Sequence, residues 1–433
     1  MSKEFGKHVR GGPPAAEKFD MNLPPVRPRF YLMLLVWAVS YIMKWLRLAR
    51  LHRVGVKGLK PPYILVCNHN AFFDFFIMHT AIRSRRANIP VAVDGFIGRE
   101  GLLRRGGGVP KRKYTADINL VRQCRKILAE RGIFVIYAEA RYSLCGLTGE
   151  LIPDSVGQLA QRMGVPVVTL KCCGHHVLDP YWGDHRARPV KRTEAFMTQI
   201  FTAEEIQDAT SEEINGKLRA YLQNDDFRWQ SENRVRNKYP KRAEGLHKPL
   251  YQCPHCMAEY QMGSRGAQLF CGACGKSWTL GEYGGLSADT GETEFAFPTD
   301  WYEWERAQVL KEIRDGTYRF ECTAAVNDLA NGKGFVRLGH GRLVHDLAGF
   351  RLSGVRDWDG EPFGMDIPAA STLAVHVEYS YVFGNGRDCI DLNTLEDTWY
   401  CYPEGQDFSV TKVSLAAEEI FKYLREGRVY EKV

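Results

Sequence analysis

His69 and Asp74 are the pair of residues in this sequence best suited to acid–base chemistry. The histidine follows an apolar run, residues 63–67, which predicts a short buried strand behind the Pro61-Pro62 breaker. A histidine at the end of a strand lies where open α/β sheets bind their ligands, and an aspartate one turn further on can fix its tautomer and orientation. The pair could therefore supply a general base. Taken alone, the spacing also fits a structural histidine at a strand-to-helix turn.

Two further stretches could recognise an anionic substrate. Residues 99–113 form a glycine-rich loop with six cations and one acid. Glycines let the backbone approach a ligand closely, and Lys and Arg side chains offer charge-assisted hydrogen bonds to phosphate. Glu139 and Arg141 stand at the end of a second apolar run, residues 134–138, where they could recognise a hydroxyl and a phosphate together. A solvated surface loop is the alternative for residues 99–113, and the Glu-x-Arg pattern is common.

Twelve cysteines include four in two Cys-x2-Cys pairs, fourteen residues apart: Cys253, Cys256, Cys271 and Cys274. Four thiolates at this spacing offer a tetrahedral zinc site and resemble a zinc ribbon. A site closed by four cysteines has no open position for catalysis, so we expect structural zinc. This stretch carries only Arg265 and Lys276 as cations, too few to bind nucleic acid phosphates well, and no nucleic acid partner is expected. The other eight cysteines lie scattered among apolar segments, which favours a reducing compartment over a disulfide scaffold.

The elements that must position His69 and the charged stretches follow an α/β order between residues 51 and 224. Strand-like segments alternate with helix-like ones, the strands at 63–67, 89–93, 133–137 and 165–170 and the helices at 116–131 and about 155–163. The helix at 116–131 gathers its apolar residues on one face and ends at Gly132. This order predicts a mixed sheet flanked by helices.

Four blocks in this order resemble the glycerolipid acyltransferase family, which includes the 1-acylglycerol-3-phosphate acyltransferases. They are Asn68-His69-x4-Asp74, the basic glycine-rich loop, Glu139-x-Arg141 and Gly164-Val-Pro-Val-Val168, and the resemblance covers about residues 30–225. It implies that His69 takes the proton from a lysophospholipid hydroxyl, which attacks an acyl thioester directly, while Asp74 orients the imidazole. An alcohol needs such a base to become a competent nucleophile, and this transfer needs no metal.

The resemblance also implies a substrate site. The family's arginine for the acceptor phosphate is matched by Lys113, with Arg112 beside it; lysine supplies charge without the bidentate fork. Glu139 matches the glutamate that binds the acceptor, with Arg141 close by, and Pro166 matches a proline that shapes the substrate pocket.

The third block departs from the family's pattern, Phe-Pro-Glu-Gly-x-Arg-Ser. Here the stretch reads Tyr137-Ala-Glu-Ala-Arg-Tyr-Ser143, so Ala138 replaces the proline and Ala140 the glycine. These changes bear on the backbone of the turn and on the identity of the acceptor.

An apolar run follows a polar tail, residues 1–29. Fourteen residues without a charge, 30–43, precede Lys44, Arg47 and further arginines. A membrane-spanning helix needs about 20 residues, so the sequence predicts an anchor helix over 30–50 that lies in the membrane interface, peripheral or monotopic, on the cytoplasmic face. A buried core helix is the alternative.

The second half of the chain reads as three regions after the acyltransferase-like domain at 51–224. Residues 225–249 are charged and predict a linker, residues 250–282 a zinc ribbon, and residues 283–433 a β-rich domain. The last region opens with a helix at about 301–315 and closes with one at about 414–425.

The leading hypothesis is an acyltransferase that moves a fatty acyl group from an acyl-CoA or acyl-carrier-protein thioester to 1-acyl-sn-glycerol-3-phosphate. Its partners would be membrane lipids and the acyl carrier, and the net charge of +7 suits an anionic membrane surface or phosphorylated substrates. One alternative is another lysophospholipid or a glycolipid as acceptor. The other is a catalytically silent membrane-bound scaffold or binding protein.

Overall fold

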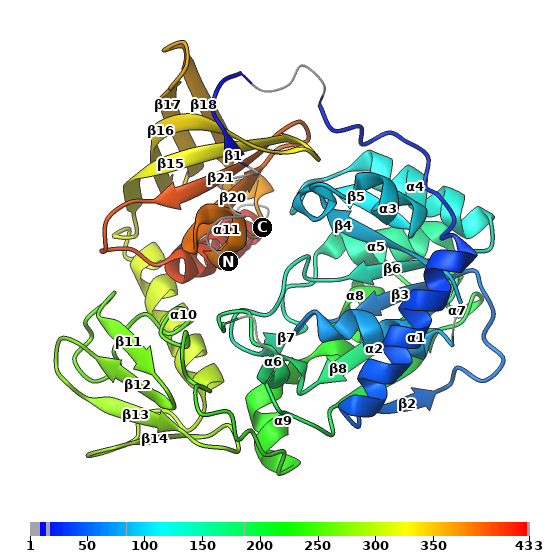
Figure 1. The fold of residues 1–433 in the computed structure, drawn as a ribbon, viewed down its shortest axis with the longest axis horizontal. Helices are drawn as coiled ribbons and strands as arrows, with labels where there is room; N and C mark the ends of the chain where they lie inside the picture. Colours follow the sequence, from blue (N-terminus) through cyan, green and yellow to red (C-terminus); the bar gives the residue numbers. More distant parts are fainter. Residues whose placement is uncertain (1–8, 14–17, 84, 185–187, 431–433) are drawn as a thin grey trace.

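A mixed seven-stranded sheet organises the N-terminal half of the chain (Figure 1). The computed structural model describes residues 9–13, 18–83, 85–184 and 188–430, without the side chains of 426–430. The strand order is β2 (Arg50–Val54), β9 (Glu194–Phe201), β8 (Val167–Cys173), β3 (Tyr63–Cys67), β6 (Ile133–Tyr137), β4 (Ala87–Ala92) and β5 (Gly108–Lys111). All pairs are parallel except β8 with β9. The carboxyl ends of β3, β6 and β8 therefore meet at one edge, where α/β sheets bind ligands.

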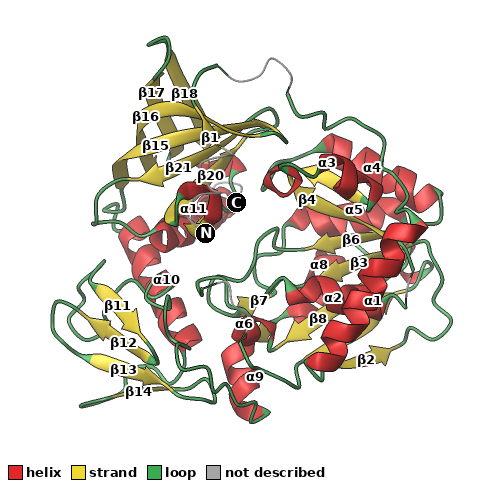
Figure 2. Cartoon of the chain, viewed as in Figure 1, coloured by secondary structure: helices red, strands yellow, loops and turns green. Residues whose placement is uncertain are grey.

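Helices cover both faces of this sheet (Figure 2). The helices of this half are α1 (Phe30–Leu46), α2 (Phe73–Ala81), α3 (Glu100–Arg105), α4 (Ile118–Ala129), α5 (Asp154–Met163), α6 (His175–Leu178), α7 (Glu205–Asp208), α8 (Ser211–Leu222) and α9 (Asp226–Glu232). All five residues of β3 are buried, and its alternate side chains enter two different cores. Tyr63 and Leu65 pack towards α2, while Ile64 and Val66 pack towards α4, α5 and α8.

Local sequence explains where several of these helices begin and end. Asp117 accepts hydrogen bonds from the first backbone N–H groups of α4, and Thr210 and Glu213 form a capping box at α8. α5 ends at Gly164, which takes the left-handed conformation that glycine adopts at low cost. The mixed α/β architecture expected for residues 51–224 is confirmed.

The cysteine-rich region is a four-stranded antiparallel sheet. Its strands are β11 (Met262–Arg265), β12 (Gln268–Cys271), β13 (Ser277–Leu280) and β14 (Leu286–Ala288), and α10 (Pro298–Arg314) follows them. The expected linker, residues 225–249, is folded instead. It opens with α9, which Asp225 caps, and it buries Ala243 and Leu246 in the core beneath the ribbon.

The C-terminal region is built on a second large sheet, as the sequence predicts. Its order is β18 (Pro362–Pro368), β17 (Gly349–Arg356), β16 (Gly334–Asp346), β15 (Phe320–Asn331), β21 (Thr398–Pro403), β20 (Arg387–Asn393) and β19 (His376–Tyr381), with α11 (Val410–Tyr430) packed against α10 and β19. Short elements complete the fold: a small ribbon of β7 (Leu147–Thr148) with β10 (Asn224–Asp225), and three 3-10 turns, η2 (Val93–Phe96), η3 (Ala369–Ser371) and η4 (Val382–Gly384).

The described part of the polar tail, residues 1–29, is attached to the folded regions. β1 (Val9–Arg10) pairs in parallel with β16. Phe19 is buried edge-on against Phe96, and its backbone N–H donates to the carbonyl of Ala330 at 2.9 Å. The tail therefore joins the C-terminal sheet to η2 of the first domain.

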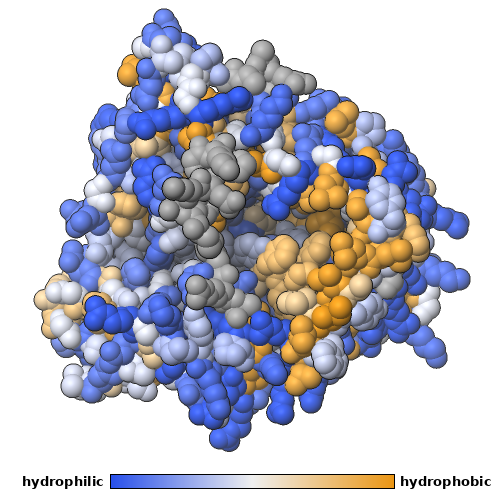
Figure 3. Space-filling model, in the orientation of Figure 1, coloured by the Kyte–Doolittle hydropathy of each residue, from blue (hydrophilic) through white to orange (hydrophobic). Residues whose placement is uncertain are grey.

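α1 lies on the surface of the α/β domain and presents an apolar face to solvent. Its most exposed large residues include Leu35 at 68% and Trp45 at 72%, and Figure 3 shows the resulting apolar band across the right of the view. Only Met33 and Ser40 of this helix are buried. Among the described residues, no helix has both the length and the apolarity needed to cross a membrane.

Candidate active site and metal centre

The loop between β3 and α2 carries His69 to the carboxyl edge of the sheet. Its Nδ1 lies 3.0 Å from Oδ2 of Asp74, in the first turn of α2. The histidine side chain is 17% exposed and the aspartate 2%. An Nδ1–H that donates to the carboxylate leaves Nε2 with its lone pair, the arrangement a general base needs.

Asp74 is held by four donors at once. Backbone N–H groups of Asn70 and Ala71 donate to its Oδ2 at 2.6 and 3.0 Å, in addition to the contact from His69. Burial would raise the pKa of the Asp74 carboxyl, but hydrogen bonds from His175 and His69 hold it well below the ordinary value. The aspartate is therefore ionised and fixed in orientation.

His175 is the functional residue that sequence reasoning missed. Its Nδ1 lies 2.5 Å from Oδ1 of Asp74, and the side chain is fully buried at the start of α6. Its Nε2 has no hydrogen-bond partner among the described residues, so Nδ1 is the ring nitrogen that contacts the carboxylate. The available signal was its position directly after the apolar run of β8.

Aromatic rings enclose His69. Tyr137 stacks on it at a centroid distance of 3.9 Å, and Tyr142 lies on it at 4.1 Å. Tyr142 in turn contacts Tyr181 at 5.5 Å, whose hydroxyl donates to Glu378 of β19. A continuous line of rings thus connects the histidine to the C-terminal sheet.

Lys113, the residue matched to a phosphate-binding arginine, faces this sheet. Its ammonium has three carboxylates and an imidazole around it: Asp391 at 3.0 Å, Glu378 at 3.4 Å, Asp94 at 3.7 Å and His376 Nδ1 at 3.2 Å. Burial alone would lower the pKa of Lys113, but these carboxylates raise it well above the ordinary value. Its charge is therefore already compensated by the protein.

Arg112 and Arg141 are also held by the C-terminal region. The guanidinium of Arg112 is buried and donates to the Thr398 hydroxyl at 2.6 Å. Arg141 donates to the Ser414 hydroxyl at 2.7 Å and to the Glu418 carboxylate at 2.5 Å, both on α11. Each of the three predicted phosphate-binding cations thus contacts the C-terminal region.

Glu139 lies beside Arg141 but faces a different partner. Its Oε1 accepts from the backbone N–H of Gly149 at 2.9 Å, and burial raises its pKa to about 7. A cavity of about 30 Å³ next to both residues has room for a water molecule rather than a lipid headgroup. With Glu139 set on the family's glutamate, the family's arginine falls on Tyr142, not on Arg141.

Pro166 is not brought near His69. It immediately precedes β8, and its carbonyl accepts from the backbone N–H of Ile64 at the start of β3. His69 lies beyond the other end of β3, roughly 15 Å away along the strands. His69 and Asp74 are thus in contact at the carboxyl edge of the sheet, while Pro166 lies at the opposite edge.

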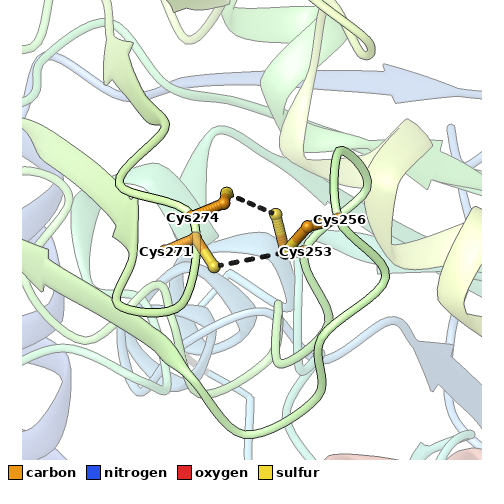
Figure 4. Close-up of side chains that lie close together, drawn as sticks. All are labelled: Cys253, Cys256, Cys271 and Cys274. Atoms are coloured by element: carbon orange, nitrogen blue, oxygen red, sulfur yellow. Dashed lines mark hydrogen bonds between the residues drawn. The ribbon is translucent and has the colours of Figure 1, made fainter.

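The four cysteines of the ribbon converge on one point (Figure 4). The sulfurs of Cys253 and Cys274 lie 3.8 Å apart and those of Cys256 and Cys271 lie 3.7 Å apart. Zn–S bonds of about 2.3 Å in a tetrahedron place sulfurs about 3.8 Å from one another. The donor set and its spacing therefore fit a tetrahedral metal ion.

Comparison with known proteins does not assign this chain to a family. No known protein-family model and no curated protein matches the sequence. Among solved structures, the chain is similar to the 1-acyl-sn-glycerophosphate (LPA) acyltransferase PlsC from Thermotoga maritima, at 16% identity and a TM-score of 0.35, covering 44% of this chain and 77% of that chain.

Proposed function

We propose that this protein is an O-acyltransferase that moves a fatty acyl group from a thioester to a glycerolipid hydroxyl. The observation that carries the proposal is the His69–Asp74 pair, in which a buried ionised carboxylate fixes the imidazole at the carboxyl edge of the sheet. The sequence blocks around this pair support the same chemistry.

The proposed reaction balances its protons on His69. Nε2 accepts the hydroxyl proton as the acceptor oxygen attacks the thioester carbonyl, and the C–S bond then breaks. The protonated imidazole returns its proton to the departing thiolate, so that the products are an ester and a free thiol. Asp74 keeps the ring oriented and stabilises the transient positive charge.

The acceptor that we propose first is 1-acyl-sn-glycerol-3-phosphate, with acyl-CoA or an acyl carrier protein as donor. A second candidate is an acceptor without a phosphomonoester, such as another lysophospholipid or a glycolipid. This candidate is favoured by the compensated charges of Lys113 and Arg141, which already face carboxylates of the C-terminal region. A catalytically silent scaffold is the third candidate and predicts no turnover with any donor.

One assay tests these alternatives together. Purified protein is offered a panel of lysolipids with acyl-CoA and with acyl carrier protein. We expect His69→Ala to lower turnover by about 10²- to 10⁴-fold, because the hydroxyl loses its base. His79→Ala is the matched control, since His79 is a buried histidine on α2 that makes no recorded contact with Asp74. Equal activity of wild type and His69→Ala would refute the mechanism.

Two further parts of the proposal concern the surroundings of the site. We propose that α1 lies in the cytoplasmic membrane interface, because it presents exposed apolar residues and packs against α2, before which Phe72 is 57% exposed and only three residues from His69. We also propose that the four cysteines hold one structural zinc ion, given the spacing of their sulfurs.

A further inference from the structure

A basic cavity of about 430 Å³ opens beside the end of α1, away from the residues assigned to acyl transfer. Trp229 of α9 forms part of its wall, and Glu194 is the only acidic residue that lines it. Six cations line the remainder, a set that we call the basic pocket: Arg50, Lys191, Arg192, Arg234, Arg236 and Lys238.

Among the described residues, cations outnumber carboxylates around this cavity. Arg50 lies 4.0 Å from Glu194, and Arg236 pairs with Glu282. No salt bridge is recorded for the other four cations to any residue that the structure describes. Six like charges around one cavity repel one another, and an anion placed among them would relieve that repulsion.

The pocket is joined directly to the C-terminal end of α1. The backbone N–H of Arg192 donates to the carbonyl of Arg47 at 2.8 Å, and that of Arg50 donates to the carbonyl of Thr193 at 2.9 Å. The Arg47 guanidinium donates to the carbonyl of Arg188 at 2.7 Å. The basic pocket therefore lies next to the C-terminal end of α1. Trp45, the most exposed of the large apolar side chains on α1, is at this end.

We propose that the basic pocket binds the phosphate-bearing headgroup of an anionic membrane phospholipid. With the apolar face of α1 in the interface, the pocket lies at the helix end, where headgroup phosphates would be within reach of its cations. Aromatic and basic residues beside an apolar helix are the usual composition of a protein surface at the headgroup level. This site is separate from the acceptor site, and it rests on membrane docking of α1 rather than on acyl transfer.

The test measures binding of the full chain to vesicles of phosphatidylcholine alone and of phosphatidylcholine with about one third phosphatidylglycerol. The pocket variant is Lys191→Gln, Arg234→Gln, Lys238→Gln, three exposed cations without a recorded ion pair. The matched control is Arg265→Gln, Lys311→Gln, Arg314→Gln, which removes the same charge from exposed positions on β11 and α10. These elements lie across the molecule from α1 (Figure 1).

We expect all three proteins to bind neutral vesicles equally and the control to bind anionic vesicles like the wild type. The pocket variant should lose roughly fivefold in affinity for anionic vesicles per cation removed, or about 100-fold in total. An unchanged pocket variant, or an equal loss in the control, would overturn the proposal. The proposal would also be overturned if inorganic phosphate alone raised the unfolding temperature of the wild type but not of the pocket variant, because the pocket would then bind a free anion.

Two additional measurements separate this proposal from the others. Leu35→Glu should weaken binding to both kinds of vesicle, because it places a charge on the docking face of α1. Turnover with a detergent-dispersed acceptor should stay unchanged in the pocket variant. If the wild type binds neither kind of vesicle, the headgroup site fails while the acyl-transfer mechanism stands.

Discussion

Asp74 orients two histidines rather than one, and only one of them could be found from local sequence. His69 is five residues away and lies on the adjacent loop, so the spacing itself brings the two side chains together. His175 is 101 positions away and meets the carboxylate because β3 and β8 are parallel neighbours that end at the same edge. No local pattern could have paired it with Asp74.

We predict that His175→Ala lowers kcat by about 10- to 100-fold while changing KM little. The hydrogen bond from His175 to the ionised Asp74 is charge-assisted, and losing such a bond costs about 1.5–3 kcal/mol. Because Asp74 would then be less firmly held, it would orient His69 less well. Steady-state kinetics across a pH series provides the measurement, with kcat and KM compared separately at each pH.

His176→Ala is the control for this prediction. His176 is equally buried and follows in the sequence, but its side chain packs near Trp182 and Phe227 and is not hydrogen-bonded to Asp74. The two variants open similar cavities and should unfold at similar temperatures. If they lose kcat equally, His175 contributes packing alone.

The predicted substrate residues illustrate where sequence reasoning stops. Glu139 and Arg141 follow a buried strand, as expected, and that much is local. The partner of Arg141 is Glu418, 277 residues further along, and no periodicity links the two. The sequence shows that these two side chains are charged. It does not show which residue pairs with Arg141, because that depends on how the C-terminal region packs.

At the scale of elements, strands and helices with a buried apolar face were predictable. β6 occupies the expected residues 133–137, and α4 and α5 begin and end within two residues of their predicted bounds. The exposed edge strand β2 gave no signal, because four of its five residues face solvent and carry no buried alternation. α9 was missed because its charged sequence conceals the burial of Asp226, Phe227 and Gln230.

The ribbon yields a prediction about metal. Freshly purified protein should contain about one zinc per chain, and Cys271→Ser should lose it together with much of the stability of the C-terminal half. The coupling follows from packing, since Cys253, Cys271 and Trp278 share one core with Trp301 of α10 and with the C-terminal sheet. Elemental analysis and thermal unfolding measure both effects.

Cys322→Ser serves as the comparison for the zinc prediction. Cys322 is a half-buried cysteine of β15 outside the four-sulfur cluster. It should retain the metal and unfold near the wild-type temperature. A metal-free wild-type protein whose four ribbon thiols all react freely would refute the zinc site.

Across the whole molecule, the C-terminal region packs against the part of the α/β domain that carries Arg112, Lys113 and Arg141. Thr398 receives Arg112, the Asp391 carboxylate faces Lys113, and α11 holds Arg141. The residues predicted to bind the substrate therefore contact the C-terminal region instead. An acceptor phosphate would have to compete with carboxylates that are already in place.

Glu418 pairs with two arginines. One of its carboxylate oxygens accepts a hydrogen bond from Arg141 and the other accepts one from Arg306. Burial would raise its pKa, but the two guanidinium groups lower it to about 2. Glu418→Gln should cost roughly 3–5 kcal/mol at neutral pH, because it removes the carboxylate paired with the buried Arg141 and one of the carboxylates around Arg306. Glu419→Gln, the adjacent substitution, should cost less, since Glu419 contacts Arg306 and Lys422 but not Arg141.

The destabilisation caused by Glu418→Gln should depend on pH, and the direction of the Glu418 pKa shift predicts how. A carboxyl whose pKa is depressed in the folded state contributes its full stability above its unfolded pKa, near 4.5, and loses it as the pH falls towards about 2. The gap in unfolding free energy between wild type and Glu418→Gln should therefore be constant from pH 7 to about 5 and shrink below that. Denaturant titrations at several pH values measure the gap. A gap that persists unchanged at pH 3 would mean that Glu418 holds the two halves together by packing and not by its charge.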